Sequence, residues 1–584
     1  MKSVRRLLTV LCLLIFVFLI GMTLNADDAK PTDWIKNTTI YQMRVSSYAS
    51  DASNYPGKTI IQTAAMHLQD LQDMGIKTIW LMPVFASPQG DDGYDVSDYM
   101  AINPDYGTIK DLKDFTDKAH KLDMKVLLDL PTNHCSKDNA LFSSKDDKIR
   151  KDKWFVWSEK DLGWPKPWQN NNGKFYPDNT WFEDPTGLER GYYYALFSDF
   201  QPDFNYNDLQ SRKEVYEYFL VVMNFWTKNC DIDGFRCDAV RYLLEAGYAK
   251  QKDLTTTHRI WKQTRKDLDK IKPSSILLAE AATESDAELL SYYGNGNEFN
   301  SGLHFRFPTK LMDTIKNGER SVDFLDSLFI IQDNIPDFKR QTQACVDSIF
   351  LNNHDGFVGD RVATQLNGDI KKEKAAASLY ILMSGIPVVY YGEEIGLQVL
   401  PPSAKYQNRG SYDWNAYKAQ KADPDSLLNH YTRLLRLRNS YDALSKGDSL
   451  FVNTGYCDTQ DTTNIKWDDS IEKASPILAM LRHDGIGKND SQDILVVNNF
   501  SSKPYYLFAD LSSLCDLADF YSGKFFYGNK PVALMGGGEY PVVSGENNTL
   551  YPLGLFAPNS TKVLLFHGFK NGDYVTYENA LKNN

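Results

Sequence analysis

The chain has 584 residues, of which 42% are hydrophobic and 24% are charged, an ordinary globular composition in a chain too long for one hydrophobic core. Its formal net charge of −12 argues against a nucleic-acid-binding protein, because a phosphate backbone selects clusters of Lys and Arg and no long basic run occurs. The aromatic fraction of 13% suits both sugar stacking and core packing, so composition does not separate these two uses.

The N-terminus has the pattern of a targeting segment. Lys2, Arg5 and Arg6 precede an apolar run that ends near Leu24. A charged stretch followed by an apolar run predicts a secretory signal peptide. The alternative is a retained signal-anchor, since roughly 18 apolar residues can nearly span a bilayer. We therefore expect a secreted or extracytoplasmic protein, anchored in a membrane if residues 1–26 are not cleaved.

The cysteines and sequons add little to this picture. The seven cysteines show neither a CxxC metal spacing nor a dense disulfide pattern. Sequons predict a glycoprotein in a host that glycosylates, and they stand at Asn37, Asn489, Asn499, Asn547 and Asn559.

From about residue 38 to residue 445, short apolar runs alternate with amphipathic stretches. The runs that predict strands are 79–82, 125–129, 233–236, 276–280, 348–352 and 387–391. The stretches that predict helices include 59–74, 109–122 and 212–229. Alternation of this kind indicates an α/β fold with a parallel sheet.

Two segments depart from the alternation. Residues 135–204 are rich in Asn, Asp and Pro, and they contain five of the eleven tryptophans, namely Trp154, Trp157, Trp164, Trp168 and Trp181. We expect an inserted subdomain there, after the third strand, with some of these rings filling its own small core. Residues 446–570 contain short strand-like runs separated by turns, which predict a C-terminal β-sandwich.

Acidic residues stand at the ends of several predicted strands: Asp129, Asp238, Glu280 and Asp355. The C-terminal ends of parallel barrel strands meet at one face, so these carboxyls can converge. Hydrolysis of a glycosidic bond with retention needs two carboxyls about 5–5.5 Å apart, one nucleophile and one general acid/base. The alternative for any single one of them is a helix cap or an ion pair.

Six short motifs, in order along the chain, resemble those of the α-amylase family. They are Gly-Tyr-Asp at 93–95, Asp-Leu-Pro-Thr-Asn-His at 129–134, Gln-Pro-Asp-Phe-Asn at 201–205, Gly-Phe-Arg-Cys-Asp at 234–238, Glu280, and Asn-His-Asp at 353–355. The similarity extends from about residue 34 to residue 566. It implies a (β/α)₈ TIM barrel built from residues 31–134 and 205–445, with the inserted subdomain and the C-terminal sandwich appended.

The resemblance implies a role for each matching carboxyl. Asp238 would be the nucleophile, and Arg236 on the same strand face would keep it ionised, since a nearby cation lowers a carboxyl pKa. Glu280 would be the general acid/base, which needs a raised pKa. Asp355 would bind sugar hydroxyls and stabilise the transition state.

The resemblance also implies binding residues. His134 and His354 would donate to hydroxyls of the same sugar ring, and Tyr94 would stack beneath it. Asp91 and Arg409 resemble a pair that closes the pocket in exo-acting α-glucosidases. Their alternative is that both are solvated loop charges.

Linkage specificity rests on fewer residues. Ala239 follows the nucleophile where relatives that prefer α-1,6 bonds often have Val, so α-1,4 linkages are favoured. Arg241 and Tyr242 replace the Lys-His pair of amylases, which leaves the usual aglycone subsites in doubt.

The hypothesis is therefore a retaining glycoside hydrolase that cleaves α-1,4 bonds in starch-derived glucans or malto-oligosaccharides. The alternatives within the family are an exo-acting α-glucosidase, an oligo-1,6-glucosidase and a transglycosylase. The alternatives of another class are a non-catalytic heavy chain of an amino-acid transporter and a glycan-binding protein. The complete set of carboxyls argues against both non-catalytic classes.

No cofactor is expected beyond a structural calcium ion, for which the sequence assigns no site. Residues 50–57, where many relatives have a calcium loop, contain too few carboxylates, and Asn133 resembles a calcium ligand without identifiable partners. We commit to no metal site. We expect a monomer whose partner is the glucan substrate, with no nucleic acid involved.

Overall fold

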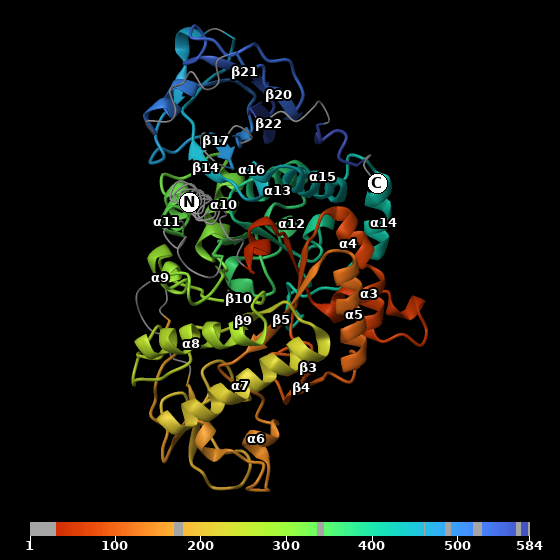
Figure 1. The fold of residues 1–584 in the computed structure, drawn as a ribbon, viewed down its shortest axis with the longest axis vertical. Helices are drawn as coiled ribbons and strands as arrows, with labels where there is room; N and C mark the ends of the chain where they lie inside the picture. Colours follow the sequence, from red (N-terminus) through yellow and green to blue (C-terminus); the bar gives the residue numbers. More distant parts are fainter. Residues whose placement is uncertain are drawn as a thin grey trace, which may run out of the picture.

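The computed structural model describes residues 31–168, 179–335, 344–460, 462–484, 492–517, 528–567 and 574–581. The predicted targeting segment, residues 1–26, lies outside the described residues. Within the described ranges, no helix combines the length and apolar character needed to cross a bilayer. The molecule is elongated, with the barrel in the middle, residues 135–204 at one end and the C-terminal sheets at the other (Figure 1).

Eight parallel strands form the central sheet, in the order β11-β10-β9-β5-β2-β1-β13-β12. They are β1 (Ile40–Met43), β2 (Thr78–Leu81), β5 (Lys125–Pro131), β9 (Gly234–Asp238), β10 (Ile276–Ala279), β11 (Ser301–Gly302), β12 (Ser348–Phe350) and β13 (Ile386–Tyr390). A parallel bridge between Leu303 and Ser348 joins the two edge strands. The sheet therefore closes on itself, which confirms the predicted (β/α)₈ barrel.

Helices surround the barrel. They are α2 (Val45–Tyr48), α3 (Ile60–Met66), α4 (Leu68–Met74), α5 (Ile109–Lys121), α7 (Leu209–Cys230), α8 (Thr255–Ile271), α9 (Asp286–Ser291), α10 (Arg306–Asn317), α11 (Phe324–Asn334), α12 (Val362–Gln365), α13 (Ile370–Ile381), α14 (Trp414–Ala422), α15 (Leu427–Ser440) and α16 (Asp442–Ser445). Local signals begin several of them: a capping box of Thr108 and Asp111 starts α5, and the Asp208 side chain caps α7.

The stretch 59–74 is helical as predicted, but it forms two helices, α3 and α4, with a break at His67. The His67 ring stacks on Trp414 with 3.6 Å between ring centroids, and its Nε2 lies 3.3 Å from Asp51 Oδ1. These tertiary contacts hold His67 outside helical geometry, so the apolar period alone could not show the break.

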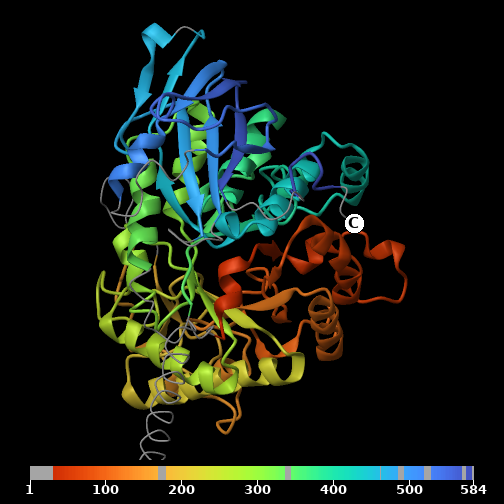
Figure 2. The same cartoon turned by 45° about the horizontal axis from the view of Figure 1, so that its top comes forward.

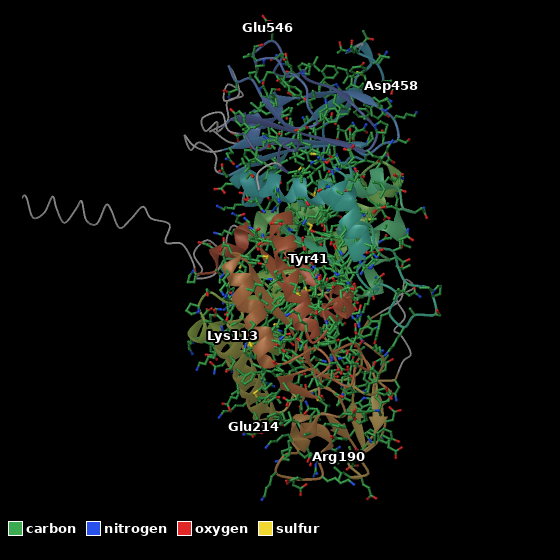
Figure 3. All side chains as sticks on the ribbon, turned by 90° about the vertical axis from the view of Figure 1, so that its right-hand side faces the viewer. Tyr41, Lys113, Arg190, Glu214, Asp458 and Glu546 are labelled. Atoms are coloured by element: carbon green, nitrogen blue, oxygen red, sulfur yellow. The ribbon has the colours of Figure 1, made fainter. Side chains whose placement is uncertain are left out.

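The segment 135–204 folds over one rim of the barrel around a three-stranded antiparallel sheet in the order β6-β8-β7. Its elements are α6 (Ala140–Ser143), β6 (Trp157–Ser158), β7 (Trp181–Glu183) and β8 (Tyr192–Tyr194). A short hairpin of β3 (Phe85–Ala86) and β4 (Asp98–Ile102) follows the second barrel strand. Arg190 lies in this end of the molecule, opposite Asp458 and Glu546 (Figure 3).

Two antiparallel sheets form the C-terminal part, drawn in blue at the top of Figure 2. One sheet, in the order β14-β17-β18-β22-β20, contains β14 (Asp448–Phe451), β17 (Ile477–His483), β18 (Asp493–Asn499), β20 (Val532–Met535) and β22 (Ser560–His567). The other, in the order β16-β15-β19-β21, contains β15 (Thr454–Cys457), β16 (Lys466–Asp468), β19 (Tyr505–Ala509) and β21 (Tyr551–Phe556).

The first of these sheets is buried on both faces. Along β17, Ile477, Ala479 and Leu481 pack against the second sheet, whereas Leu478 and Met480 belong to the core of the barrel. Side chains alternate between the faces of a strand, so one strand serves both cores. This is a β-sandwich fused to the barrel through one of its sheets.

Candidate active site

The predicted carboxyls gather around one buried arginine. Arg236 and Asp238 lie two residues apart on β9, so both side chains point to the same side of the strand. Arg236 Nη1 is 2.7 Å from Asp129 Oδ1 and 2.6 Å from Asp238 Oδ1, and its Nη2 is 3.2 Å from Glu280 Oε2. Strands β5, β9 and β10 thus bring three acidic side chains to one guanidinium.

Glu280 follows the end of β10 and has the properties of a proton donor. Burial raises its pKa well above the usual range, against the opposing effect of Arg236. Its Oε2 accepts a hydrogen bond from the Ala239 N–H at 2.8 Å. Ala239 adopts a left-handed backbone conformation with φ of +51°, a sparsely populated state for alanine that directs this N–H to Glu280.

Asp355, His354 and Tyr94 form a second group beside the first. Burial raises the pKa of Asp355 to about 6, although the Arg409 and Arg236 cations oppose this. His354 Nε2 lies 2.8 Å from the Tyr94 hydroxyl and 3.2 Å from Asp355 Oδ2. Burial also lowers the pKa of His354 well below its usual value, so its ring is neutral at pH 7. The Tyr94 hydroxyl donates to Asp129 at 3.0 Å, which links the two groups.

His134 follows β5 and lines the same cavity. Its Nε2 is 3.3 Å from Gln201 Nε2, and burial lowers the pKa of its ring. Gln201 also donates to Asp91 Oδ2 at 3.0 Å. The motif at 201–205 therefore supplies a side chain that spans two predicted binding residues.

All but one of the predicted site residues line one cavity of about 570 Å³, and Arg236 lies beneath it. The lining residues that were predicted are Asp91, Tyr94, His134, Asp238, Glu280, His354, Asp355 and Arg409. Those that the sequence did not single out for binding are Trp168, Phe197, Tyr242, Ala282, Glu284 and Phe357.

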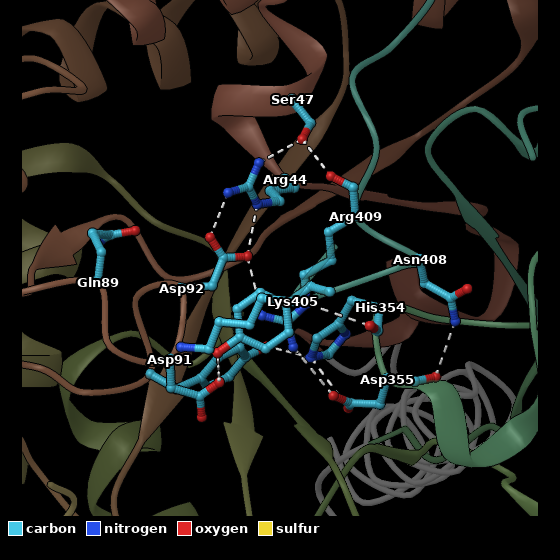
Figure 4. Close-up of polar contacts among 12 residues, drawn as sticks. Arg44, Ser47, Gln89, Asp91, Asp92, His354, Asp355, Lys405, Asn408 and Arg409 are labelled. Carbon is cyan, nitrogen blue, oxygen red and sulfur yellow. Dashed lines mark hydrogen bonds and ion pairs between the residues drawn. The ribbon is translucent and has the colours of Figure 1, made fainter. Parts of the chain in front are cut away.

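The expected ion pair between Asp91 and Arg409 has a different form. Arg409 Nη1 is 3.1 Å from Asp92 Oδ2, and its Nη2 is 3.4 Å from Asp355 Oδ1 (Figure 4). Asp91 instead accepts hydrogen bonds from the Tyr406 hydroxyl at 2.9 Å and from Gln201. Asp91 and Arg409 share the cavity wall, but the carboxylate in contact with Arg409 at this loop is Asp92.

Three aromatic rings form the wall on the inserted-subdomain side. Trp168 and Phe197 lie 6.1 Å apart in a stacked arrangement, and Tyr242 meets Phe197 edge-on at 5.7 Å. Tyr242 occupies the place of the amylase histidine, and Trp168 is one of the clustered tryptophans. The aromatic richness of 135–204 was the available signal for this wall, although it could not identify which rings face the cavity.

A set of oxygen donors meets where the inserted subdomain joins the barrel. Asn133 Nδ2 donates to Asp203 Oδ2 at 2.8 Å. Burial raises the pKa of Asp203 to about 8, and burial together with repulsion from Asp203 raises that of Glu245. The buried Glu245 Oε1 has no protein partner. Across the described ranges no group of three or more His, Cys, Asp or Glu side chains could hold a metal ion. The unpartnered Glu245 Oε1 and the Asp203 carboxyl fit an oxygen-seeking cation such as calcium, whereas the Asn133 amide turns its NH₂ group to Asp203.

Comparison with known proteins adds the following. A family model described as "Alpha amylase, catalytic domain" matches residues 53–409. Alpha-amylase 3 of Dictyoglomus thermophilum is 31% identical over 460 residues, which cover 74% of this chain and 83% of that relative. A trehalose synthase of Pimelobacter sp. is 27% identical over 581 residues, covering 88% and 92%. The crystal structure of an α-amylase from H. orenii superposes with a TM-score of 0.68 at 26% identity, covering 91% of this chain and 100% of that one.

Proposed function

Because the chain belongs to the α-amylase family of glycoside hydrolases, we propose that it cleaves α-1,4-glucosidic bonds in short malto-oligosaccharides with retention of configuration. The observation that carries this proposal is that Asp238 and Glu280 form ion pairs with the two terminal nitrogens of Arg236, at 2.6 and 3.2 Å. One guanidinium thereby keeps both carboxyls within reach of a single sugar ring.

The residues support a double displacement. Asp238 attacks the anomeric carbon while Glu280 gives its proton to the departing glycosidic oxygen, which leaves a β-glycosyl ester on Asp238. Glu280, now ionised, takes a proton from water, and the hydroxide oxygen bonds to the anomeric carbon as the ester bond breaks. The product is the α-anomer, and both carboxyls return to their starting states.

The closed end of the cavity supports action at the non-reducing terminus of a chain. The Tyr406 hydroxyl donates to Asp91 at 2.9 Å and also lies 3.2 Å from the Gly90 carbonyl, so the loop that carries Arg409 is tied to the loop after β3. We infer that these joined loops close one end of the cavity, so that it accepts one terminal glucose and excludes a chain that continues past it.

Maltoheptaose tests the proposal, with the Asp238→Asn protein as control. Products are followed by chromatography, and the anomer is read by NMR before mutarotation. Stepwise release of α-glucose, absent in the control, supports exo-acting hydrolysis with retention. A spread of α-malto-oligosaccharides would instead indicate endo action, and β-products would contradict retention.

Transfer of glucose to another sugar is a second candidate. The rings of Trp168, Phe197 and Tyr242 cover the leaving-group side, where an apolar wall can hold a sugar acceptor and exclude water. Several curated relatives are named trehalose synthase. Incubation with maltose distinguishes the candidates, because a transferase forms trehalose or longer oligosaccharides at high substrate concentration whereas a hydrolase forms glucose alone.

Export from the cytoplasm belongs to the same proposal. It is supported by the basic residues and the apolar run within residues 1–26. Mass spectrometry of the N-terminus of the mature protein, after fractionation of the producing cells, tests both export and cleavage. An intact N-terminus in a soluble cytoplasmic fraction would contradict it.

A further inference from the structure

Asp92 bridges two arginines behind the active-site cavity. Arg44, which follows β1, donates from Nε to Asp92 Oδ2 at 2.7 Å and from Nη2 to Asp92 Oδ1. The same Oδ2 is 3.1 Å from Arg409 Nη1. Figure 4 shows the three side chains in a row, with Asp92 between the two cations. Asp92 and Arg409 are buried, with side chains 5% and 6% exposed.

The backbone of Asp92 is held in an unusual conformation for this contact. Its φ is +53°, in the left-handed region that residues other than glycine rarely adopt, asparagine and aspartate most readily among them. Asp91 lines the cavity, whereas Asp92 and Arg44 do not. The two neighbouring acidic residues therefore have different surroundings: Asp91 faces the substrate space, and Asp92 contacts Arg409 from behind the cavity.

The position of the Arg409 head group depends on a balance of carboxylates. Its Nη2 lies 3.4 Å from Asp355 Oδ1, on the cavity side. Without the charge of Asp92, attraction to Asp355 and Asp91 would draw the guanidinium into the space of a sugar ring. The loop itself is held by two hydroxyls. Ser47 Oγ, which accepts from Arg44 Nη1 at 2.5 Å, donates to the Arg409 carbonyl at 3.1 Å, and Tyr391 OH donates to the Gly410 carbonyl at 2.7 Å.

We propose that Arg44 and Asp92 are positioning residues that fix the Arg409 guanidinium at the closed end of the cavity and thereby determine selectivity for the terminal glucose of a chain. This inference rests on the proposed exo-acting function. Arg44 acts on the substrate through Arg409, which it reaches by way of Asp92 and Ser47, so its substitution changes binding without removing any group that touches the sugar.

The test compares Arg44→Met, Arg44→Lys and Asp92→Asn with the wild-type enzyme on maltotriose and maltoheptaose. Asparagine tolerates the left-handed conformation, so Asp92→Asn removes the charge and keeps the turn. For Arg44→Met and Asp92→Asn we expect KM to rise about tenfold with kcat nearly unchanged, the pattern of lost uniform binding. We also expect these two variants to release maltose and longer products from maltoheptaose early in the reaction. Arg44→Lys recovers part of the affinity, because its ammonium keeps one contact with Asp92.

Arg190→Met is the matched control. Arg190 also pairs with a buried aspartate: its side chain is 11% exposed, against 24% for Arg44, and its Nε is 2.9 Å from Asp184 in the inserted subdomain. If Arg44 has only a structural role, Arg44→Met and this control should both melt at a lower temperature while keeping the wild-type KM and products. That result would overturn the inference. Wild-type KM and products from Asp92→Asn would overturn it as well. A wild-type enzyme that releases no glucose from maltoheptaose would instead refute the proposed function on which the inference rests.

Discussion

Arg236 is fully buried and cannot neutralise all the carboxyls around it. Asp129 and Asp238 lie within 2.7 Å of one terminal nitrogen, and Glu280 lies 3.2 Å from the other. Three ionised carboxyls and one cation would leave a net negative charge in a buried site, which is unfavourable. The pKa of Asp129 is accordingly raised to about 7 by burial, and that of Glu280 is raised further above its usual range. The site therefore retains a proton near neutral pH, as the acid step requires.

At the same scale, we predict that kcat/KM falls as the pH drops through about 6, where Asp355 becomes protonated and loses its charge. Arg409 lowers the pKa of Asp355 and Asp91 raises it, with burial as the largest cause. Arg409→Met should therefore move this acid limb to higher pH, and Asp91→Asn should move it to lower pH. Profiles of kcat/KM against pH for the three proteins measure this. Shifts in one common direction would contradict the assignment to Asp355.

The sequence could predict residues that stand in motifs and not those that act through geometry. Asp238, Glu280 and Asp355 stand at strand ends within short motifs, so their convergence was foreseeable. Asp92 was missed because nothing in an Asp-Asp-Gly sequence shows which of the two carboxyls turns to Arg409. That choice depends on the left-handed φ of Asp92, which the folded loop imposes.

At the element scale, the length of each strand or helix and its dependence on distant contacts decided whether the sequence could predict it. Strands β5, β9 and β10 are apolar runs that overlap the predicted ranges, whereas β11 has two residues and leaves no periodic pattern. The break between α3 and α4 at His67 depends on Trp414, far along the chain, which no local pattern reports. The short β1 was likewise not predicted, although its four residues are all buried.

A buried histidine joins three elements beside the barrel. His304 Nδ1 is 2.7 Å from Asp347 Oδ2 before β12, and its Nε2 is 3.1 Å from Asp286 in α9 and 3.0 Å from Ser327 in α11. Despite burial, which acts in the opposite direction, the two aspartates raise the pKa of His304 to about 9. The imidazolium is therefore present in the folded protein across the neutral range.

This network predicts a pH-dependent stability. The folded pKa of about 9 lies above the unfolded value of 6.5, so the contribution is fully present below pH 6.5 and is lost as pH rises through 9. Its size is about 3 kcal/mol by order of magnitude. The melting temperature of His304→Gln should thus lie well below wild type at pH 6 and approach it near pH 10.

His430→Gln is the control for this prediction. Burial lowers the pKa of His430 to about 3, so its ring stays neutral from pH 6 to pH 10. Only the unfolded ring titrates, near pH 6.5, so the difference between this variant and wild type should change by under about 1 kcal/mol between pH 6 and pH 10, in the opposite direction to that of His304→Gln. A difference for His304→Gln that is the same at pH 6 and pH 10 would contradict a raised pKa of His304 in the folded protein.

The oxygen donors between the inserted subdomain and the barrel predict an effect of calcium. Asp203 and Glu245 are buried carboxyls with raised pKa values, and a divalent cation would stabilise their ionised forms. Millimolar calcium should raise the melting temperature relative to chelator-treated protein, and Glu245→Gln should lose most of this increase. Equal melting temperatures with calcium and with chelator would contradict a site at these residues.

At the scale of the whole molecule, the barrel and the C-terminal sandwich share a core. Helix α13 lies against β22, and Val563 and Leu565 of that strand pack in the barrel cluster. A buried ion pair crosses the same boundary: Arg320, after α10, is 2.6 Å from Asp468 of β16, and neither side chain is exposed. Coupling through an apolar interface and a buried charge pair leads us to expect one cooperative unfolding transition.

Arg320→Met tests this coupling. The substitution leaves Asp468 buried without its cation, which typically costs about 3–5 kcal/mol. Lys473→Met, which removes a pair with Asp469 whose side chains are 49% and 56% exposed, should cost under about 1 kcal/mol. In calorimetry we expect Arg320→Met to unfold at a lower temperature but still in one transition, because the shared apolar core remains. Two separate transitions would show that Arg320 and Asp468, and not the packing of the first sheet on the barrel, hold the two parts together.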